Sequence, residues 1–271
     1  MKAGASEGPP VVCLDLDGVV WRGDQPIAPA IAGVARLRAA GLNVAFLSNN
    51  SAVPVGDVVA KLRGMGVAAE PEEVLTSALA AAHLLGRDLA AGSRVLVCGG
   101  AGVREALAAE SLVVVDRGPA DAVVVGLDRE FGYAALTEAS GAVRAGARFV
   151  ATNLDATYPV PGGMIPGAGS IVASVATAAG AQPEVAGKPA RPMAELVRER
   201  FGDRGVMVGD RPSTDGAMAE TLGWPFALVL SGVTAAVAPP GGEAIPDPPP
   251  PFVAADLGAL VDPLLESLLH A

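Results

Sequence analysis

The stretch VVCLDLDGVV, residues 11–20, decides the fold of this chain. Its short apolar run, ending in glycine, predicts a buried parallel strand that leads into a loop. Asp15 and Asp17 lie two positions apart, so their side chains leave the strand on the same side, roughly 6–7 Å from each other. Two carboxylates at that distance repel by roughly 2–3 kcal/mol at an effective dielectric of about 20. Either a metal ion, a proton or a lysine offsets this charge, or the two aspartates are solvated loop residues without a role.

Helices and strands alternate after this first strand. Residues 28–40 have helical periodicity, residues 43–47 predict a second buried strand, and residues 55–65 predict a second helix. This order is typical of a doubly wound parallel sheet, in which ligands bind beyond the carboxyl ends of the strands. Ser48 follows the second strand, so we expect it to converge with the two aspartates. Its hydroxyl suits an anion such as phosphate, although an ordinary turn is the alternative.

A second α/β block of about 100 residues follows, opened by a predicted helix at 72–86. Its other elements are expected to be strands at 94–98, 112–115, 121–126 and 148–152, and helices at 101–109 and 133–145. Residues 152–169 are rich in proline and glycine and predict a long loop, followed by a helix at 170–179. Long ordered loops often carry function.

The last third of the chain contains a lysine and two acids at similar positions. Lys188 lies between a loop and a predicted helix at 192–201, in a chain with only three lysines against 16 arginines. The strand predicted at 205–209 ends in Asp210, with Asp215 five residues further on. This arrangement predicts a metal site beside a capped helix.

Three further elements complete the C-terminal part. The helix after Asp215 is expected to end near residue 222, and a strand is expected at 226–230. Residues 238–251 hold seven prolines and predict a surface segment of polyproline II type. Residues 254–270 predict a terminal amphipathic helix.

The glycine-rich turn after residues 94–98 allows two other functions. Cys98 and Arg104 fit the Cys-x5-Arg spacing of cysteine phosphatases, in which a thiolate at a helix N-terminus attacks phosphate. The same turn, with Asp116 after the next strand, is similar to a dinucleotide-binding fingerprint, but Glu105 stands where the third glycine belongs. Both remain open, against a small buried cysteine that ends a strand.

Composition restricts the partners and the compartment. The formal net charge of −10 argues against a nucleic-acid or anionic-membrane surface, and 51% hydrophobic residues allow a sizeable core. Two cysteines indicate a reducing compartment, and residues 1–10 lack the apolar run of a signal peptide, so we predict a cytoplasmic location. The uncharged stretch 156–183 is too short and too broken by proline and glycine to cross a bilayer.

The ordered set of motifs resembles a known superfamily. DLDGV at 15–19, then Ser48, Lys188, and finally Asp210 with Asp215 resemble, in this order, the four motifs of the haloacid dehalogenase superfamily of phosphohydrolases. The resemblance spans nearly the whole chain. It implies a Rossmann-like doubly wound parallel-sheet core with an inserted α/β cap domain. We assign the core to residues 1–78 and 182–271, and the cap to residues 79–181.

Three motifs within the cap narrow the branch. VVGLDREF at 124–131, ATNLDATYP at 151–159 and GMIPGAG at 163–169 resemble the p-nitrophenylphosphatase-like branch, subfamily IIA. That branch includes sugar-phosphate, glycerol-phosphate and pyridoxal-phosphate phosphatases. One departure is Ser48, where the branch usually has threonine; the hydroxyl is retained.

The resemblance implies a role for each acid. Asp15 is the nucleophile that forms an aspartyl-phosphate, and Asp17 protonates the leaving alkoxide and then deprotonates the attacking water. Mg²⁺ is held by Asp15, the Asp17 carbonyl and Asp210, while Asp215 supports these ligands without binding the metal directly. Mg²⁺ is needed because an anionic carboxylate cannot otherwise approach a phosphate dianion. The acid–base role falls to Asp17 because histidine is scarce: only His83 and His270 occur.

The phosphoryl group has its own implied ligands. Ser48 and Lys188 bind its oxygens, helped by the backbone N–H groups of Gly18 and Asn49. These groups supply one positive charge and several donors to a dianion.

The implied activity is Mg²⁺-dependent hydrolysis of small phosphorylated metabolites, such as sugar or glycerol phosphates, with p-nitrophenyl phosphate as an artificial substrate. Asp155 and Tyr158 are our candidates for substrate contacts, in a loop expected to close over the active site. A homodimer through the cap is also implied. Two alternatives remain: a catalytically silent binding module on the same fold, and a phosphomutase, which the large cap disfavours.

Overall fold

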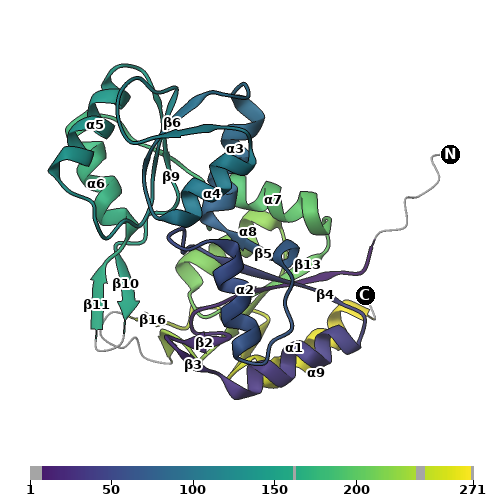
Figure 1. The fold of residues 1–271 in the computed structure, drawn as a ribbon. Helices are drawn as coiled ribbons and strands as arrows, with labels where there is room; N and C mark the ends of the chain where they lie inside the picture. The colour runs from purple at the N-terminus through teal and green to yellow at the C-terminus, as the bar shows by residue number, and fades with distance from the viewer. Residues whose placement is uncertain (1–7, 161–162, 236–241, 270–271) are drawn as a thin grey trace. The chain divides into compact units, whose positions relative to one another are not determined.

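The chain divides by its internal contacts into two compact units. The computed structural model describes residues 8–160, 163–235 and 242–269 (Figure 1). Unit 1 comprises Met1–Leu47, Val59–Val74 and Ala194–Ala271. Unit 2 comprises Ser48–Val58 and Leu75–Met193. By this division, residues 48–58 and 182–193 belong to unit 2. The assignment from the sequence, with boundaries after 78 and 181, places them in the core, and that assignment stays a prediction.

The elements alternate through both units. The helices in the described ranges are α1 (Ala28–Ala39), α2 (Val55–Gly64), η1 (Pro71–Glu73), α3 (Ser77–Asp88), α4 (Ala101–Ala109), α5 (Tyr133–Arg144), α6 (Ala168–Ala179), α7 (Arg191–Phe201), η2 (Pro212–Gly216), α8 (Ala217–Leu222) and α9 (Leu257–Leu269). The strands there are β1 (Val11–Asp15), β2 (Trp21–Arg22), β3 (Gln25–Pro26), β4 (Asn43–Ser48), β5 (Val74–Thr76), β6 (Arg94–Cys98), β7 (Val113–Val115), β8 (Ala122–Val125), β9 (Arg148–Ala151), β10 (Thr157–Val160), β11 (Gly163–Pro166), β12 (Glu184–Val185), β13 (Gly205–Gly209), β14 (Phe226–Val229), β15 (Thr234–Ala235), β16 (Glu243–Ala244) and β17 (Phe252–Ala254).

The strand that carries Asp15 lies inside the larger sheet, whose order is β17-β14-β13-β1-β4-β5. β1 pairs in parallel with β13 on one side and with β4 on the other. Its first four residues are fully buried, as expected for a strand with both faces covered. α1 and α9 pack side by side in the same unit (Figure 1). The structure confirms the predicted parallel α/β class.

Unit 2 is built on a second parallel sheet, with the order β12-β9-β8-β6-β7. α5 and α6 pack together, and a core forms from strand residues such as Val123 and Phe149 with helix residues such as Val172. Cys98, at the end of β6, is part of this core. The predicted second α/β block is therefore present, and it includes an antiparallel pair, β10 and β11.

Two sequence predictions are wrong. The loop expected at 152–169 contains the β10–β11 ribbon, and two-stranded ribbons tolerate prolines such as Pro159 and Pro166 at positions that a central strand would exclude. The helix expected at 72–86 begins only at Ser77, after η1 and β5. Thr76 ends β5 and caps this helix, because its hydroxyl accepts a hydrogen bond from the Leu79 N–H at 3.2 Å.

The C-terminal part also contains short strands that the sequence did not predict. β16 and β17 lie in or beside the segment expected as polyproline II, of which residues 238–241 are outside the described ranges. The terminal helix begins at Leu257, three residues later than expected, because β17 uses the residues before it. Across the described residues, no helix has the length and apolar character needed to cross a bilayer.

Candidate active site

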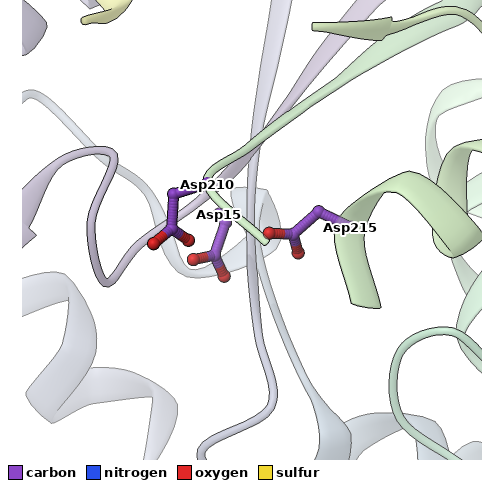
Figure 2. A group of neighbouring side chains, drawn as sticks. All are labelled: Asp15, Asp210 and Asp215. Atoms are coloured by element: carbon purple, nitrogen blue, oxygen red, sulfur yellow. The ribbon is translucent and has the colours of Figure 1, made fainter. Parts of the chain in front are cut away.

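Three carboxylates of unit 1 converge at the carboxyl ends of neighbouring strands (Figure 2). Asp15 is the last residue of β1, Asp210 follows β13 directly, and Asp215 lies in η2. One oxygen from each carboxylate lies within 4.8 Å of the others. Asp210 and Asp215 are buried, with exposed fractions of 4% and 1%, and Asp15 is partly buried. The parallel arrangement of β1 and β13 therefore brings together Asp15, Asp210 and Asp215, as the sequence predicted.

Backbone donors hold two of these carboxylates in place. The N–H of Val233 donates to Asp210 Oδ2 at 2.7 Å, and the Thr234 hydroxyl donates to the Asp210 backbone oxygen at 2.6 Å. The N–H of Arg211 donates to Asp215 Oδ2 at 3.1 Å. The two N–H bonds fix the orientation of the carboxylates, and the Thr234 bond holds the backbone of Asp210.

Glycines leave the space that the carboxylates fill. A Cβ added at Gly232 would lie 1.8 Å from Asp210 Oδ2, and one added at Gly18 would lie 2.4 Å from the same atom. Gly18 also has a φ of +87°, which a side chain disfavours. Its N–H donates to the Trp21 carbonyl oxygen at 2.7 Å, and its predicted role in binding phosphate stays a prediction.

The donor set fits a hard divalent cation. Three carboxylate oxygens this close repel one another strongly unless positive charge lies nearby. Mg²⁺ and Ca²⁺ prefer oxygen ligands, and carboxylates above all. The three acids could therefore accommodate Mg²⁺, with Asp215 near enough either to bind it directly or to support Asp15 and Asp210.

Asp17 has a different environment from these three acids. Within the described ranges its carboxylate is outside the three-acid group, and its Oδ1 accepts a hydrogen bond from Trp21 Nε1 at 2.9 Å. Asp17 lies two residues beyond the end of β1 and is partly buried. Its roles in proton transfer and in metal binding through its carbonyl both stay predictions.

Ser48 is the last residue of β4 and is 5% exposed. Leu47, the residue before it, is the register partner of Asp15. The Ser48 hydroxyl oxygen accepts the N–H of Asn50 at 3.1 Å, which leaves its own hydrogen for another acceptor.

Unit 2 contains hydrogen bonds among residues that were predicted to bind the phosphoryl group or the rest of the substrate. The Asn49 amide donates to the Lys188 backbone oxygen at 3.1 Å and to Asp155 Oδ2 at 3.2 Å. The Asn50 amide donates to the Tyr158 hydroxyl at 3.2 Å. The predicted phosphate-binding segment is thus joined to both predicted substrate contacts. The sequence analysis missed Asn50, although the run SNNS at 48–51 marks it as polar.

A second layer of bonds fixes Asn49. Its backbone oxygen accepts the Asn153 amide at 2.6 Å and the Ser77 hydroxyl at 2.7 Å. The carboxamide oxygen of Asn49 is buried and has no hydrogen-bond partner among the described residues. A buried carbonyl oxygen without a partner can accept a hydrogen bond from a ligand or a water molecule.

The cysteine-phosphatase alternative loses its chemical basis. Burial raises the pKa of the Cys98 thiol to about 12; Asp128 adds to this effect, and Arg104 opposes it. Arg104 instead pairs with Asp116 at 2.6 Å on the surface. A thiol this weakly acidic is protonated at neutral pH and is a poor nucleophile.

Packing also explains the glycines of the dinucleotide alternative. A Cβ at Gly100 would lie 2.3 Å from the Ala52 backbone oxygen, and one at Gly102 would lie 2.2 Å from that of Val53. These glycines allow close contact between two backbones of unit 2, so a nucleotide is not needed to account for them.

Comparisons with known proteins identify the family. A family model described as haloacid dehalogenase-like hydrolase matches residues 12–112, and a related HAD-hydrolase-like model matches residues 185–260. The chain is 37% identical over 205 residues to an acid sugar phosphatase of Staphylococcus saprophyticus, covering 74% of this chain and 79% of that protein. This chain belongs to the haloacid dehalogenase-like hydrolases.

Other relatives in this family are also phosphatases. A D-glycerol 3-phosphate phosphatase of Mycobacterium tuberculosis is 42% identical over 226 residues, which cover 82% of this chain and 63% of that protein. The chain thus spans less than two thirds of that relative.

Solved structures agree with these relatives. A glycerol phosphate phosphatase of M. tuberculosis in complex with magnesium has a TM-score of 0.82 at 39% identity, covering 92% of this chain and 76% of that one. A p-nitrophenyl phosphatase of Archaeoglobus fulgidus has a TM-score of 0.85 at 28% identity, covering 95% and 100%. The resemblance to the p-nitrophenylphosphatase-like branch, subfamily IIA, and the enzyme class of phosphoric monoester hydrolase are confirmed.

Proposed function

We propose that this protein is a Mg²⁺-dependent phosphatase that hydrolyses small phosphate monoesters through an aspartyl-phosphate at Asp15. The observation that carries the proposal is the convergence of Asp15, Asp210 and Asp215 within 4.8 Å at the ends of β1 and β13. The named activities of its relatives, on D-glycerol 3-phosphate and on sugar phosphates, support the substrate class. The magnesium in a related structure supports the choice of metal.

The metal supplies charge compensation when bound. Asp15, the Asp17 carbonyl and Asp210 would hold Mg²⁺, with Asp215 supporting them. A bound divalent cation offsets the negative charge of both the nucleophile and the phosphoryl group, so that a carboxylate can approach phosphorus.

Two carboxylates then carry out the reaction in two steps. In the first, an oxygen of Asp15 attacks phosphorus, the bond to the ester oxygen breaks, and Asp17 gives its proton to that oxygen as the alcohol leaves. In the second, Asp17 takes a proton from water, the water oxygen attacks the phosphorus of the aspartyl-phosphate, and inorganic phosphate departs with Asp15 restored. Each step has a lower barrier than direct attack by water on the ester.

The other polar residues bind the substrate in this proposal. Lys188, which is 4% exposed, and Ser48 bind phosphoryl oxygens, and the N–H groups of Gly18 and Asn49 assist. Asp155 and Tyr158 select the leaving group; both are oriented by hydrogen bonds from asparagine amides. The cytoplasmic location and the homodimer through the cap stay predictions.

The direct test is hydrolysis of p-nitrophenyl phosphate and of a panel of sugar and glycerol phosphates, with excess EDTA and then with Mg²⁺ restored. We expect activity to vanish with EDTA and to return with Mg²⁺. Full activity in EDTA would contradict the proposal. A folded protein that hydrolyses none of the esters would favour the silent binding module, and transfer between sugar phosphates without release of phosphate would favour the phosphomutase.

A further inference from the structure

A hydrogen bond links the proposed acid–base residue to a tryptophan four positions later. Trp21 Nε1 donates to Asp17 Oδ1 at 2.9 Å, and Trp21 is only 4% exposed, so water competes little for this bond. An indole N–H is a donor only. It therefore selects Oδ1 as the accepting oxygen of Asp17, in either protonation state, and leaves proton transfer to Oδ2.

The backbone fixes the position of Trp21. Its carbonyl oxygen accepts the Gly18 N–H at 2.7 Å, and its own N–H donates to the Leu16 oxygen at 3.2 Å. Trp21 also pairs with Pro26 in the β2–β3 ribbon. These bonds close a tight turn around Asp17 and fix the backbone position from which the indole reaches the carboxylate.

The ammonium group of Lys61 lies over the ring of Trp21. Its Nζ lies 4.4 Å from the centroid of the Trp21 ring, donates to the Gly23 backbone oxygen at 2.8 Å and lies 3.6 Å from Asp24 Oδ1. A cation over an indole face is attracted by the ring quadrupole. These contacts give the positive charge of Lys61 a place over the ring.

We propose that Trp21 is a positioning residue that orients Asp17 for proton transfer, and that Lys61 holds Trp21 in place. This inference rests on the proposed function, because orientation of Asp17 affects turnover only if Asp17 moves the proton. Without the indole N–H, the carboxylate rotates more freely, and Oδ2 spends less time facing the leaving oxygen.

The variant Trp21→Phe tests the proposal, because it keeps an aromatic ring under Lys61 and removes the N–H. We expect kcat/KM for glycerol 3-phosphate, which reports formation of the aspartyl-phosphate, to fall about 10- to 100-fold, the range for a lost hydrogen bond to a charged group. The kcat/KM for p-nitrophenyl phosphate should fall less than about threefold, because its leaving group needs little protonation.

The second tryptophan provides a matched control. Trp224 is 9% exposed, and its Nε1 donates to the Asp203 backbone oxygen at 2.8 Å, so Trp224→Phe removes a comparable bond in the same unit. We expect both substrates to be turned over by Trp224→Phe at the normal rate. Equal losses for both substrates in Trp21→Phe would overturn the proposal.

The variant Asp17→Asn separates failure of the inference from failure of the proposed function. If Asp17→Asn lowers kcat/KM equally for both substrates, the acid role fails. If Asp17→Asn is selective for glycerol 3-phosphate and Trp21→Phe is not, only the positioning role fails. In the Asp17→Asn background, Trp21→Phe should cause no further loss, whereas an additive loss would show a merely structural role.

Lys61 variants keep the proposal testable if Trp21→Phe does not fold. Lys61→Met keeps the aliphatic stem and removes the charge, so we expect a smaller loss with the same preference between substrates. Lys61→Arg restores a cation over the ring and should recover activity. A Lys61→Met enzyme with unchanged rates, or with equal losses for both substrates, would remove Lys61 from the argument.

Discussion

Replacing Asp210 with asparagine should make the metal-free protein more stable and at the same time prevent its stabilisation by Mg²⁺. The substitution keeps the shape of the side chain and an oxygen that can accept the Val233 N–H. It removes one of three negative charges that meet within 4.8 Å. Stability and function therefore change in opposite directions at this residue.

The size of the effect follows from the geometry. At about 4.8 Å and an effective dielectric of about 20, each pair of charges repels by about 3.5 kcal/mol. Asp210→Asn removes two of the three pairs, which sum to about 7 kcal/mol before solvent screening and the backbone donors are considered. Water at the partly exposed Asp15 and the backbone donors reduce this, and we expect a net gain of about 1–3 kcal/mol. For a chain of this length, that gain raises Tm by about 2–10 °C.

The assay is thermal unfolding in EDTA and in a Mg²⁺ titration. The wild-type protein should gain about 2.7 kcal/mol at a Mg²⁺ concentration of about 100 times Kd, because the metal binds only the folded state. The variant should gain much less. Asp203→Asn is the matched control: Asp203 has a side chain that is 85% exposed, 3.5 Å from Arg198, and its loss should change neither quantity.

Two results would refute this reasoning. A lower Tm for metal-free Asp210→Asn would show that the three charges do not repel in the folded protein as the geometry requires. A Mg²⁺ shift of wild-type size in the variant would show that the ion binds elsewhere.

Four further predictions concern the chemistry. Asp17→Asn should lose most of its kcat/KM toward alkyl phosphates and much less toward p-nitrophenyl phosphate; equal losses in kcat/KM would contradict an acid role. Cys98→Ser should keep near-normal turnover while Asp15→Asn abolishes it with an unchanged circular dichroism spectrum, and the opposite pattern would reverse the assignment of the nucleophile. Burial raises the pKa of the Cys98 thiol to about 12, so iodoacetamide should label it far more slowly in the folded protein than in the unfolded one. Asp155→Ala should change the ranking of kcat/KM among phosphate esters with little change in Tm, and an unchanged ranking would remove Asp155 from substrate selection.

Buried parallel strands were the most predictable part of the fold. The runs that form β1 and β13 are apolar on both faces; the bounds of β13 were predicted to the residue, whereas β1 was predicted only to lie within residues 11–20. β10 and β11 could not be predicted, because they show no alternation and are stabilised by pairing with each other. β5 lies beside an alanine-rich helix, and its three residues carry too little signal to separate it from that helix.

The candidate site was predictable where the backbone alone determines it. Strand order and register place Asp15 near Asp210, and both follow from the position of each residue at the end of a strand. The bond between Asn49 and Asp155 joins residues 106 positions apart and depends on how a loop folds back. The indole bond to Asp17 depends on the direction in which a ring leaves a turn, which residue spacing does not determine.

The pairing of β1 has a consequence for the order in which the protein is made. β1 receives one neighbour early, in β4, but its other neighbour, β13, begins only at Gly205. At about 5–20 residues per second, a ribosome needs about 8–30 s to travel from β4 to β13. All of unit 2 is synthesised in that interval, so it can fold while β1 still lacks one of its two partners. The carboxylate cluster cannot exist until Asp215 has been translated, so the growing chain passes through most of its synthesis without a place to capture metal.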